Sequence, residues 1–390
     1  MNSLPEANLK FAIDTYHKLR EEHPHDNLLF APVNATSALG LLAMASGHEQ
    51  AAKIEKVLHW DEVKECDTSR NRRYLEAVES IGLISARVKV GMEKFELSSP
   101  DNLHPLSDFF PSVQKFISNA LNLYRTDVEG INLKNAPEEV RGIINHWVEA
   151  QTQDKIKDLL LEDSFDCHAQ LLQLNALYLK GQWKVKFNKD LTVEAPFYSH
   201  YAAKNDCQTV QLMNRNGIYN TATFDVGDTE VQVLEIPFKD NELSLYVMLP
   251  TDSGPEALKQ LEDSLTHEHL LDWASHLKPE LVDLFIPKFS LEKKFYLNQY
   301  LDLHDLSDPK KADFSQATTT EGVTLTQLVH DAFLEINEEG CEEVEDPRLC
   351  RDRRSHRKAL EFMVDHPFLY FVHHKCTQSI ILFGKFSKPE

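Results

Sequence analysis

The residues with the clearest chemical meaning lie in one basic run, Arg351-Asp-Arg-Arg-Ser-His-Arg-Lys358. Trypsin-like serine proteases cleave after basic residues, so an exposed Arg354–Ser355 bond would act as bait for such a protease. The alternative interpretation is a solvated run of charges without any role. The basic run alone does not separate these two interpretations.

The segments on either side of this run indicate how it is held. An apolar, strand-like segment ends at Glu335-Ile-Asn-Glu-Glu-Gly340, and another begins within Asp365-His-Pro-Phe368 and the residues after it. The residues between them are mostly polar and have no sustained apolar period. Compact domains seldom contain so long a connection without secondary structure unless it is functional or disordered. We therefore predict an exposed loop of about residues 341–364, carried between two strands.

These flanking motifs resemble the reactive-centre region of the serpins, in particular of the intracellular ovalbumin-type branch. Five further segments are similar to serpin motifs and follow in the same order: Asn145-His-Trp-Val-Glu-Ala-Gln-Thr152, Leu174-Asn-Ala-Leu-Tyr-Leu-Lys-Gly-Gln-Trp183, Ile286-Pro-Lys-Phe289, Lys311-Ala-Asp-Phe-Ser315 and Ile381-Leu-Phe-Gly-Lys-Phe386. The resemblance implies a serpin fold of the α+β class, with helices packed on large, mostly antiparallel sheets. It also implies a single domain over residues 1–390.

The resemblance also implies a mechanism. An inhibitory serpin offers its loop to a protease as a substrate, and the freed upstream limb then inserts as a new strand of the main sheet. Counting forward from Gly340 and back from Asp365 places the reactive bond between Arg354 and Ser355. The hinge implied in the same way comprises Glu338, Glu339, Gly340, Cys341, Glu343, Glu345 and Pro347.

The hinge departs from the family pattern, in which small residues follow the glycine. Alternation along a strand would turn Cys341, Glu343, Glu345 and Pro347 toward the core. A small, nearly apolar cysteine is tolerable there, but unpaired carboxylates are costly to bury and proline removes a ladder hydrogen bond. Together they would oppose insertion by something on the order of 10 kcal/mol.

Three other segments differ from the family pattern. The strand expected near Ser98–Pro105 is not recognisable, and Asp302–Ser307 replaces a longer family segment. The early Phe-Ser-Pro-x-Ser pattern is Phe30-Ala-Pro-Val-Asn34 here, so hydroxyls that support sheet opening in relatives are lost. All three differences favour poor inhibition.

Two functional hypotheses follow. We favour a non-inhibitory or substrate-like serpin whose basic loop is a protease-sensitive or partner-binding segment. The alternative is a suicide-substrate inhibitor of a trypsin-like serine protease, with Arg354–Ser355 as the scissile bond. In either case the expected protease partner is trypsin-like, and we expect no enzymatic activity, no cofactor and no bound metal.

Composition restricts the remaining classes of function. The net charge of −21 opposes general binding of nucleic acid, which is itself a polyanion. No apolar run is long enough to span a membrane, and the six cysteines are scattered, as is typical of a reducing compartment. No signal-like segment stands at Met1–Ala7, so we expect a cytoplasmic monomer. The resemblance leaves release from the cell without a cleaved signal as an alternative.

Periodicity predicts the main elements. We expect an amphipathic opening helix around residues 11–19, an apolar helix over 37–44 and a helix over 137–156. We expect a buried central strand over 171–179, strands over 231–236 and 243–249, and a hairpin turn over 374–379.

Other patterns with possible chemistry are weaker. Ser355 and His356 are neighbours in the loop, and adjacent side chains do not readily form a held nucleophile–base pair. We interpret His267, His269, His373 and His374 as surface histidines, because they lack the accompanying ligands of a metal site. The glycosylation sequon at Asn34 falls at a predicted buried helix start, so we expect it to be unused.

Overall fold

The computed structural model describes residues 3–63, 111–124, 137–165, 168–199, 207–239, 241–341 and 359–390. The predictions on residues 98–105 and on the loop from Glu343 to Lys358 lie outside these ranges. The chain forms two compact units, the first built from residues 1–11, 32–178 and 292–333, the second from residues 12–31, 179–291 and 334–390. The prediction of one serpin domain over residues 1–390 stays a prediction.

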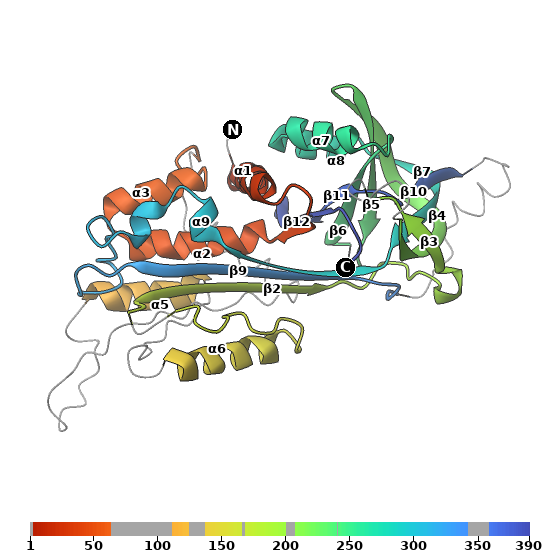
Figure 1. Ribbon diagram of the computed structural model, residues 1–390. Coiled ribbons are helices and arrows are strands. Elements are labelled where there is room, and N and C mark those ends of the chain that lie inside the picture. Colours follow the sequence, from red (N-terminus) through yellow and green to blue (C-terminus); the bar gives the residue numbers. More distant parts are fainter. Residues whose placement is uncertain are drawn as a thin grey trace. The chain divides into compact units, whose positions relative to one another are not determined.

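The first unit contains a sheet with helices on both faces. Strands β2 (Leu171–Lys180), β9 (Leu325–Ile336) and β8 (Phe289–Tyr296) form a three-stranded sheet in the order β2-β9-β8, and the ends of all three continue into the second unit. The helical elements are α2 (Pro32–Ala45), α3 (His48–Val57), α5 (Pro111–Tyr124), α6 (Pro137–Gln151), α9 (Leu297–Tyr300) and the 3-10 turn η3 (His304–Ser307). Figure 1 shows α2 and α3 on one side of β2 and β9, and α6 on the other.

An apolar layer lies between α6 and this sheet. Val140, Ile144 and Val148 of α6 pack with Leu172 and Leu174 of β2. Their spacing of three and four residues places them on one helix face, as an amphipathic helix requires. Val329 of β9 belongs to the same cluster, so the helix covers β2 and β9.

The second unit is built on a nine-stranded sheet. Its main path runs in the order β1-β12-β11-β6-β5-β4-β7-β10, with β3 paired to β4. The strands are β1 (Leu28–Phe30), β3 (Val193–Phe197), β4 (Gln208–Val226), β5 (Thr229–Pro237), β6 (Leu243–Pro250), β7 (Lys278–Pro287), β10 (Leu360–Met363), β11 (Phe368–His374) and β12 (Ser379–Phe386). The pair β7–β10 is parallel and the other pairs are antiparallel. The helical elements of this unit are η2 (Lys189–Leu191), α7 (Pro255–Ser264) and α8 (His267–His276).

Several predicted elements are confirmed. The opening helix is α1 (Leu4–Glu22), and its residues Phe11, Ile13, Tyr16 and Leu19 are buried. The predicted apolar helix is α2, which begins earlier, at Pro32. The predicted buried strand is β2, but in the described residues it stands at one end of the order β2-β9-β8 and not at its centre. The two alternating segments are the antiparallel pair β5–β6, and the last turn joins β11 to β12.

Three predictions are wrong in detail. Helix α6 ends at Gln151 and not at residue 156, because Gln153 and Asp154 have φ values of 53° and 59°, outside the helical region. The predicted loop is too long, since residues 360–363 form β10. His373 and His374 are buried rather than on the surface, because β11 lies inside the sheet between β6 and β12.

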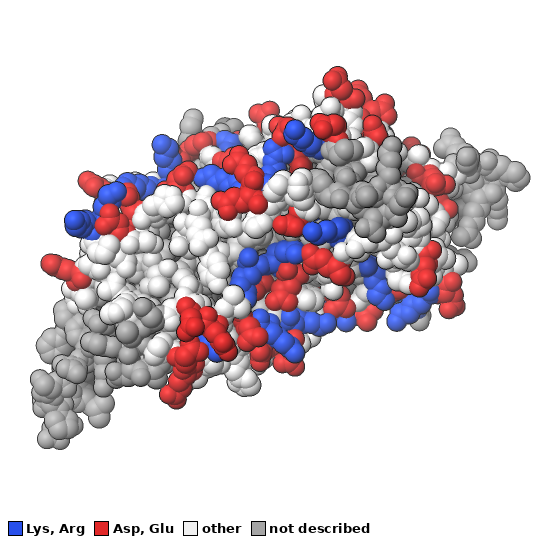
Figure 2. Space-filling model, viewed as in Figure 1, with Lys and Arg blue, Asp and Glu red and all other residues white. Residues whose placement is uncertain are grey.

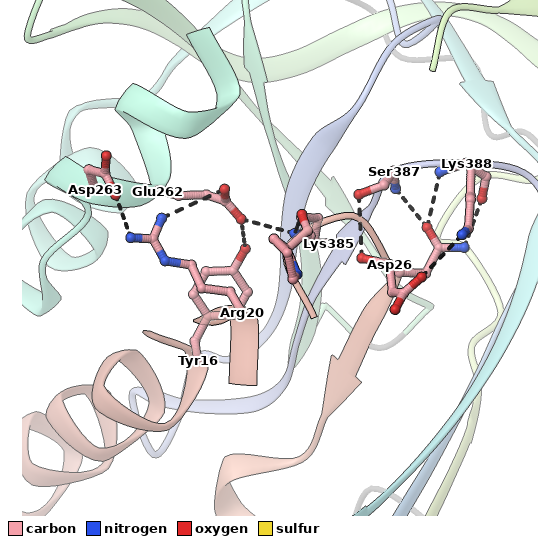
Figure 3. Close-up of polar contacts among 10 residues, drawn as sticks. Tyr16, Arg20, Asp26, Glu262, Asp263, Lys385, Ser387 and Lys388 are labelled. Atoms are coloured by element: carbon pink, nitrogen blue, oxygen red, sulfur yellow. Dashed lines mark hydrogen bonds and ion pairs between the residues drawn. The ribbon is translucent and has the colours of Figure 1, made fainter. Parts of the chain in front are cut away.

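A buried polar network in the second unit joins α7 and β12 to the part of α1 from residue 12 onward (Figure 3). Glu262 of α7 accepts a hydrogen bond from the Tyr16 hydroxyl of α1 at 2.5 Å and lies 3.3 Å from the Lys385 ammonium group of β12. The Arg20 guanidinium group of α1 adds a third contact at 3.6 Å. Burial lowers the pKa of Lys385, although Glu262 opposes this shift. Because each charge has an opposite partner, the network holds α1, α7 and β12 together.

The surface carries charges of both signs. Figure 2 shows acidic and basic side chains interspersed over the face that it draws. None of the helices in the described ranges is long and apolar enough to cross a membrane. In the same ranges, no group of three or more His, Cys, Asp or Glu side chains is arranged to hold a metal ion. His269 instead caps α8, since its ring accepts a hydrogen bond from the Thr266 backbone.

Candidate functional site at the hinge

The candidate site begins where β9 ends. A turn follows at Asn337, whose side-chain oxygen accepts a hydrogen bond from the Glu339 backbone at 2.9 Å. The Asn337 amide in turn donates to Glu335 at 2.7 Å. A side chain that bonds to the backbone two residues further on replaces a backbone turn. The asparagine therefore sets the direction in which the chain leaves the strand.

The hinge residues that the structure describes are paired with the segment that follows β2. Trp183 donates its backbone N–H to Glu339 and accepts from the Cys341 N–H, at 3.0 Å and 2.9 Å. Lys186 donates to the Cys341 carbonyl at 2.9 Å, and Phe187 donates to the Glu338 carbonyl at 3.1 Å. Trp183 and Gly340 form a parallel bridge. The hinge is therefore closed by backbone hydrogen bonds as far as Cys341.

Gly340 is required by this close approach. A Cβ atom at this position would lie 2.7 Å from the Trp183 carbonyl oxygen and 2.8 Å from the Lys186 Cα atom. Both neighbours are backbone atoms, which a side-chain rotation cannot move away. Glycine is the residue that allows two backbones to approach so closely.

Trp183 anchors the segment opposite the hinge. Its side chain is 1 % exposed and its indole N–H donates to the Asn337 carbonyl at 2.6 Å. The indole ring stacks on Phe238 with a centroid distance of 4.7 Å and packs edge-on against Phe187. A buried tryptophan thus satisfies its polar atom while its ring fills the core.

Glu338 is the buried charge of the hinge. It is 6 % exposed, lies 3.0 Å from the Lys288 ammonium group and accepts a hydrogen bond from the Thr192 hydroxyl at 3.2 Å. Burial would raise the pKa of Glu338, but the hydrogen bonds from Lys288 and Thr192 outweigh burial and hold the pKa below its ordinary value. Glu339 faces outward and pairs with Lys180 at 3.1 Å.

The downstream end of the loop is anchored in the same compact unit. Strand β10 pairs in parallel with β7, and Phe362 is fully buried. The Asp365 carbonyl accepts a hydrogen bond from the Tyr198 backbone at 2.7 Å. The His366 ring lies 2.8 Å from both the Asp365 carboxylate and the Pro250 carbonyl. The described chain is therefore held by hydrogen bonds at Cys341 and again from β10 onward.

Of the predicted site residues, the structure places Glu338, Glu339, Gly340 and Cys341 together, at the closed hinge. The remaining ones lie outside the described residues, and they are Glu343, Glu345, Pro347, Arg354 and Ser355. The sequence did not single out Lys288 and Trp183 as partners of the hinge. Both residues belong to sequence motifs that resemble those of the serpin family. Their presence in these motifs was the only feature of the sequence that could have pointed to them.

Deep in the first unit, Asn34 occupies the position of a lost hydroxyl. It is 2 % exposed, and its side-chain amide makes no hydrogen bond. Its backbone carbonyl accepts a hydrogen bond from the Asn175 amide of β2 at 2.5 Å. An unsatisfied buried amide is costly, so Asn34 is an unfavourable polar residue in the first turn of α2.

Comparison with known proteins assigns the family. The family model described as "Serpin (serine protease inhibitor)" matches residues 6–389, and the chain therefore belongs to the serpin family. The chain is 34% identical to human Serpin B3 and 32% identical to human leukocyte elastase inhibitor, with 100% of both chains covered in each case. A crystal structure of uncleaved ovalbumin matches with a TM-score of 0.85 and 26% identity over 100% of both chains.

These matches confirm the predicted fold and the ovalbumin-type branch. The family consists of protease inhibitors rather than enzymes.

Proposed function

We propose that this serpin exposes residues 342–358 as a protease-sensitive or partner-binding segment and does not insert them into its main sheet after cleavage. The observation that carries the proposal is the hinge sequence after Gly340, which places Glu343, Glu345 and Pro347 on the inward face of an inserting strand. Inserted carboxylates would need buried partners, and an inserted proline would leave one carbonyl of the ladder without its donor.

The closed hinge adds to the free energy that insertion requires. A limb that inserts between β2 and β9 must first break the pairing of Trp183 and Lys186 with the hinge, and it must move Glu338 away from Lys288. A limb of small apolar residues would offset these losses by adding a strand to the sheet. The acidic limb of this chain would gain much less free energy on insertion, so it would offset only a small part of them.

The outcome then depends on two competing rates. Inhibition needs insertion to be faster than hydrolysis of the acyl-enzyme intermediate. If insertion is slower, the protease completes the cleavage and leaves, and the serpin is consumed as a substrate. We propose this outcome for trypsin-like serine proteases, with cleavage in the basic run that contains Arg354–Ser355. We further propose a cytoplasmic monomer that binds neither nucleic acid nor membranes.

Incubation with trypsin, followed by a denaturing gel, tests the proposal. We expect cleavage after Arg351, Arg353, Arg354 or Arg357 and no SDS-stable complex. A band at the summed mass of protease and serpin would contradict the proposal. The variant Arg354→Ala is the matched control, because loss of such a band in this variant would assign the trap to the Arg354–Ser355 bond.

A second candidate function is inhibition of a trypsin-like serine protease through Arg354–Ser355. Its support is that a relative 32% identical over the whole chain carries the name leukocyte elastase inhibitor. The same gel separates the two candidates, since only an inhibitor forms the stable complex.

A further inference from the structure

Asp331 is a buried carboxylate in the middle of β9, outside the hinge. Its side chain is 0 % exposed, and no hydrogen bond of good geometry reaches its carboxylate, although the Ala332 backbone N–H lies near enough to lower its pKa slightly. Val329 and Phe333, two residues away on either side, pack with the apolar layer beneath α6. Because side chains alternate along a strand, Asp331 lies on that same face. A carboxylate therefore stands where the sheet is otherwise covered by apolar side chains.

The segment above Asp331 is residues 137–165, named the cover here, and it consists of α6 and the irregular chain after it. Asn145 fixes its two parts together, since its amide donates to the Leu160 carbonyl at 2.8 Å and its oxygen accepts from the Leu160 N–H at 2.9 Å. Thr152 accepts from the Ile156 N–H at 3.1 Å. The helix and the chain after it can therefore move as one body.

Few charged groups face Asp331. Lys294 and Glu292 of β8 act on it, and the Lys294 ammonium group is 3.8 Å from its carboxylate. From the cover, Lys155 lies over the Phe333 ring at 5.6 Å, whereas α6 presents Val140, Ile144 and Val148. The neighbouring His330 is fully buried, and burial lowers its pKa to about 3, so it stays neutral.

Lys294 connects Asp331 to the cover. Its ammonium group donates to the Asp158 carbonyl oxygen at 2.6 Å, while the same group faces Asp331. One cation therefore serves both a backbone carbonyl of the cover and the buried carboxylate. When the Asp331 carboxyl group is neutral, it does not attract the Lys294 ammonium group away from the Asp158 carbonyl oxygen.

We propose that Asp331 is a proton-controlled latch, which holds the cover on β9 when it is protonated and loosens the cover when it is ionised. An ionised carboxylate without hydrogen bonds is unstable in an apolar layer, and opening the cover gives it water. Burial raises the pKa of Asp331 to about 7, so the change falls near neutral pH. The latch is independent of the loop sequence, and it would act on any step in which β2 and β9 separate.

The direction of the pH effect follows from the raised pKa. The closed form keeps its proton up to a pH of about 7, whereas an exposed aspartate loses it near 3.8. The open form therefore binds fewer protons than the closed form over this interval. Closure becomes less favourable as the pH rises from about 4 to about 7, and the loss is complete above that range.

Hydrogen exchange of the full-length protein tests the latch. Between pH 6 and pH 8, the protection of residues 137–165, corrected for intrinsic exchange, should fall about tenfold in the wild type. The variant Asp331→Asn has a similar shape and no charge, so its protection should not change with pH. The matched control Glu139→Gln removes an exposed carboxylate of the cover that has no part in the latch, and it should behave like the wild type.

Two results would overturn the proposal. One is equal protection of residues 137–165 in the wild type at pH 6 and pH 8. This result does not depend on whether any variant folds. The other is an Asp331→Asn protein that loses protection as the wild type does, because the titrating group would then lie elsewhere.

Discussion

At the scale of single residues, Gly340 is held by backbone atoms on two sides. The Trp183 carbonyl and the Lys186 Cα atom leave no room for a Cβ atom. The closed hinge therefore requires a glycine at position 340 for steric reasons.

The variant Gly340→Ala should lower the free energy of unfolding by about 1–3 kcal/mol, because the added methyl group forces the paired backbones apart. Chemical denaturation measures this loss. Gly142, on the exposed part of α6, is the control position, since a Cβ atom there has no neighbour within 4 Å. Gly142→Ala should be neutral or stabilising by up to about 1 kcal/mol. Equal effects at both positions would contradict the packing argument.

Glu338 supports a second prediction at this scale. The variant Glu338→Gln should be less stable than the wild type at pH 7 by about 1–3 kcal/mol, because Lys288 and Thr192 lose their anionic partner. The pKa of Glu338 is lowered in the folded state, so its contribution is present above pH 4.5 and is lost as the pH falls through the folded-state pKa.

Denaturation curves from pH 7 down to pH 3 measure this loss. The free energies of unfolding of Glu338→Gln and of the wild type should approach each other as the pH falls. The control Glu339→Gln removes an exposed carboxylate paired with Lys180, and such pairs contribute about 0–1 kcal/mol. A difference for Glu338→Gln that stays constant with pH would mean that the carboxylate is not held in its ionised form.

At the scale of elements, the proposed function makes the hinge limb decide whether a strand can be added to the sheet. Replacing residues 343–347 by alanine removes the inward carboxylates and Pro347. After cleavage in the loop, the melting temperature of this variant should rise above that of its uncleaved form, as measured by thermal unfolding of both forms. The rise should be partial, because the sequence from Ser98 to Pro105 does not match the strand expected in the receiving sheet.

The outcome that would contradict this argument is a cleaved alanine variant with no gain in melting temperature. The obstacle to insertion would then lie in the sheet itself. The polar start of α2 at Asn34, with its unsatisfied amide, would be the next position to change.

The sequence predicted strong periodic elements better than their limits. The buried alternation of β5 and β6 and the apolar face of α1 were visible because burial on one side imposes a fixed period. The end of α6 was not visible, since the positive φ values of Gln153 and Asp154 arise from how the following chain packs. Strand β10 was missed because its alternation is only four residues long.

The candidate site was predictable only in part. Family motifs located Glu338 and Gly340, but the pairing of Glu338 with Lys288 joins residues that are distant in sequence. No local pattern reports such a contact. Asp331 was missed for a similar reason. A single acidic residue in a strand is expected to face solvent, and only the structure shows that a helix covers this face of β9.

At the scale of the whole molecule, the freed limb has two alternatives after the loop is cut: it inserts into the sheet or it stays outside. The serpin family assignment covers residues 6–389 and brings with it the possibility of insertion. Under the proposed function, the hinge sequence opposes insertion, and the closed hinge opens before insertion begins. The behaviour after cleavage is therefore set by the free-energy difference between the cleaved forms with and without an inserted limb.

The melting temperature before and after cleavage measures this difference most directly. The wild-type protein would be cut by trypsin within residues 348–358, the cut confirmed by mass, and both forms heated under identical conditions. We predict melting temperatures within a few degrees of each other, because the cleaved limb stays outside the sheet. A large rise in the cleaved form would show that the limb inserts despite Glu343, Glu345 and Pro347, and would contradict the proposed function.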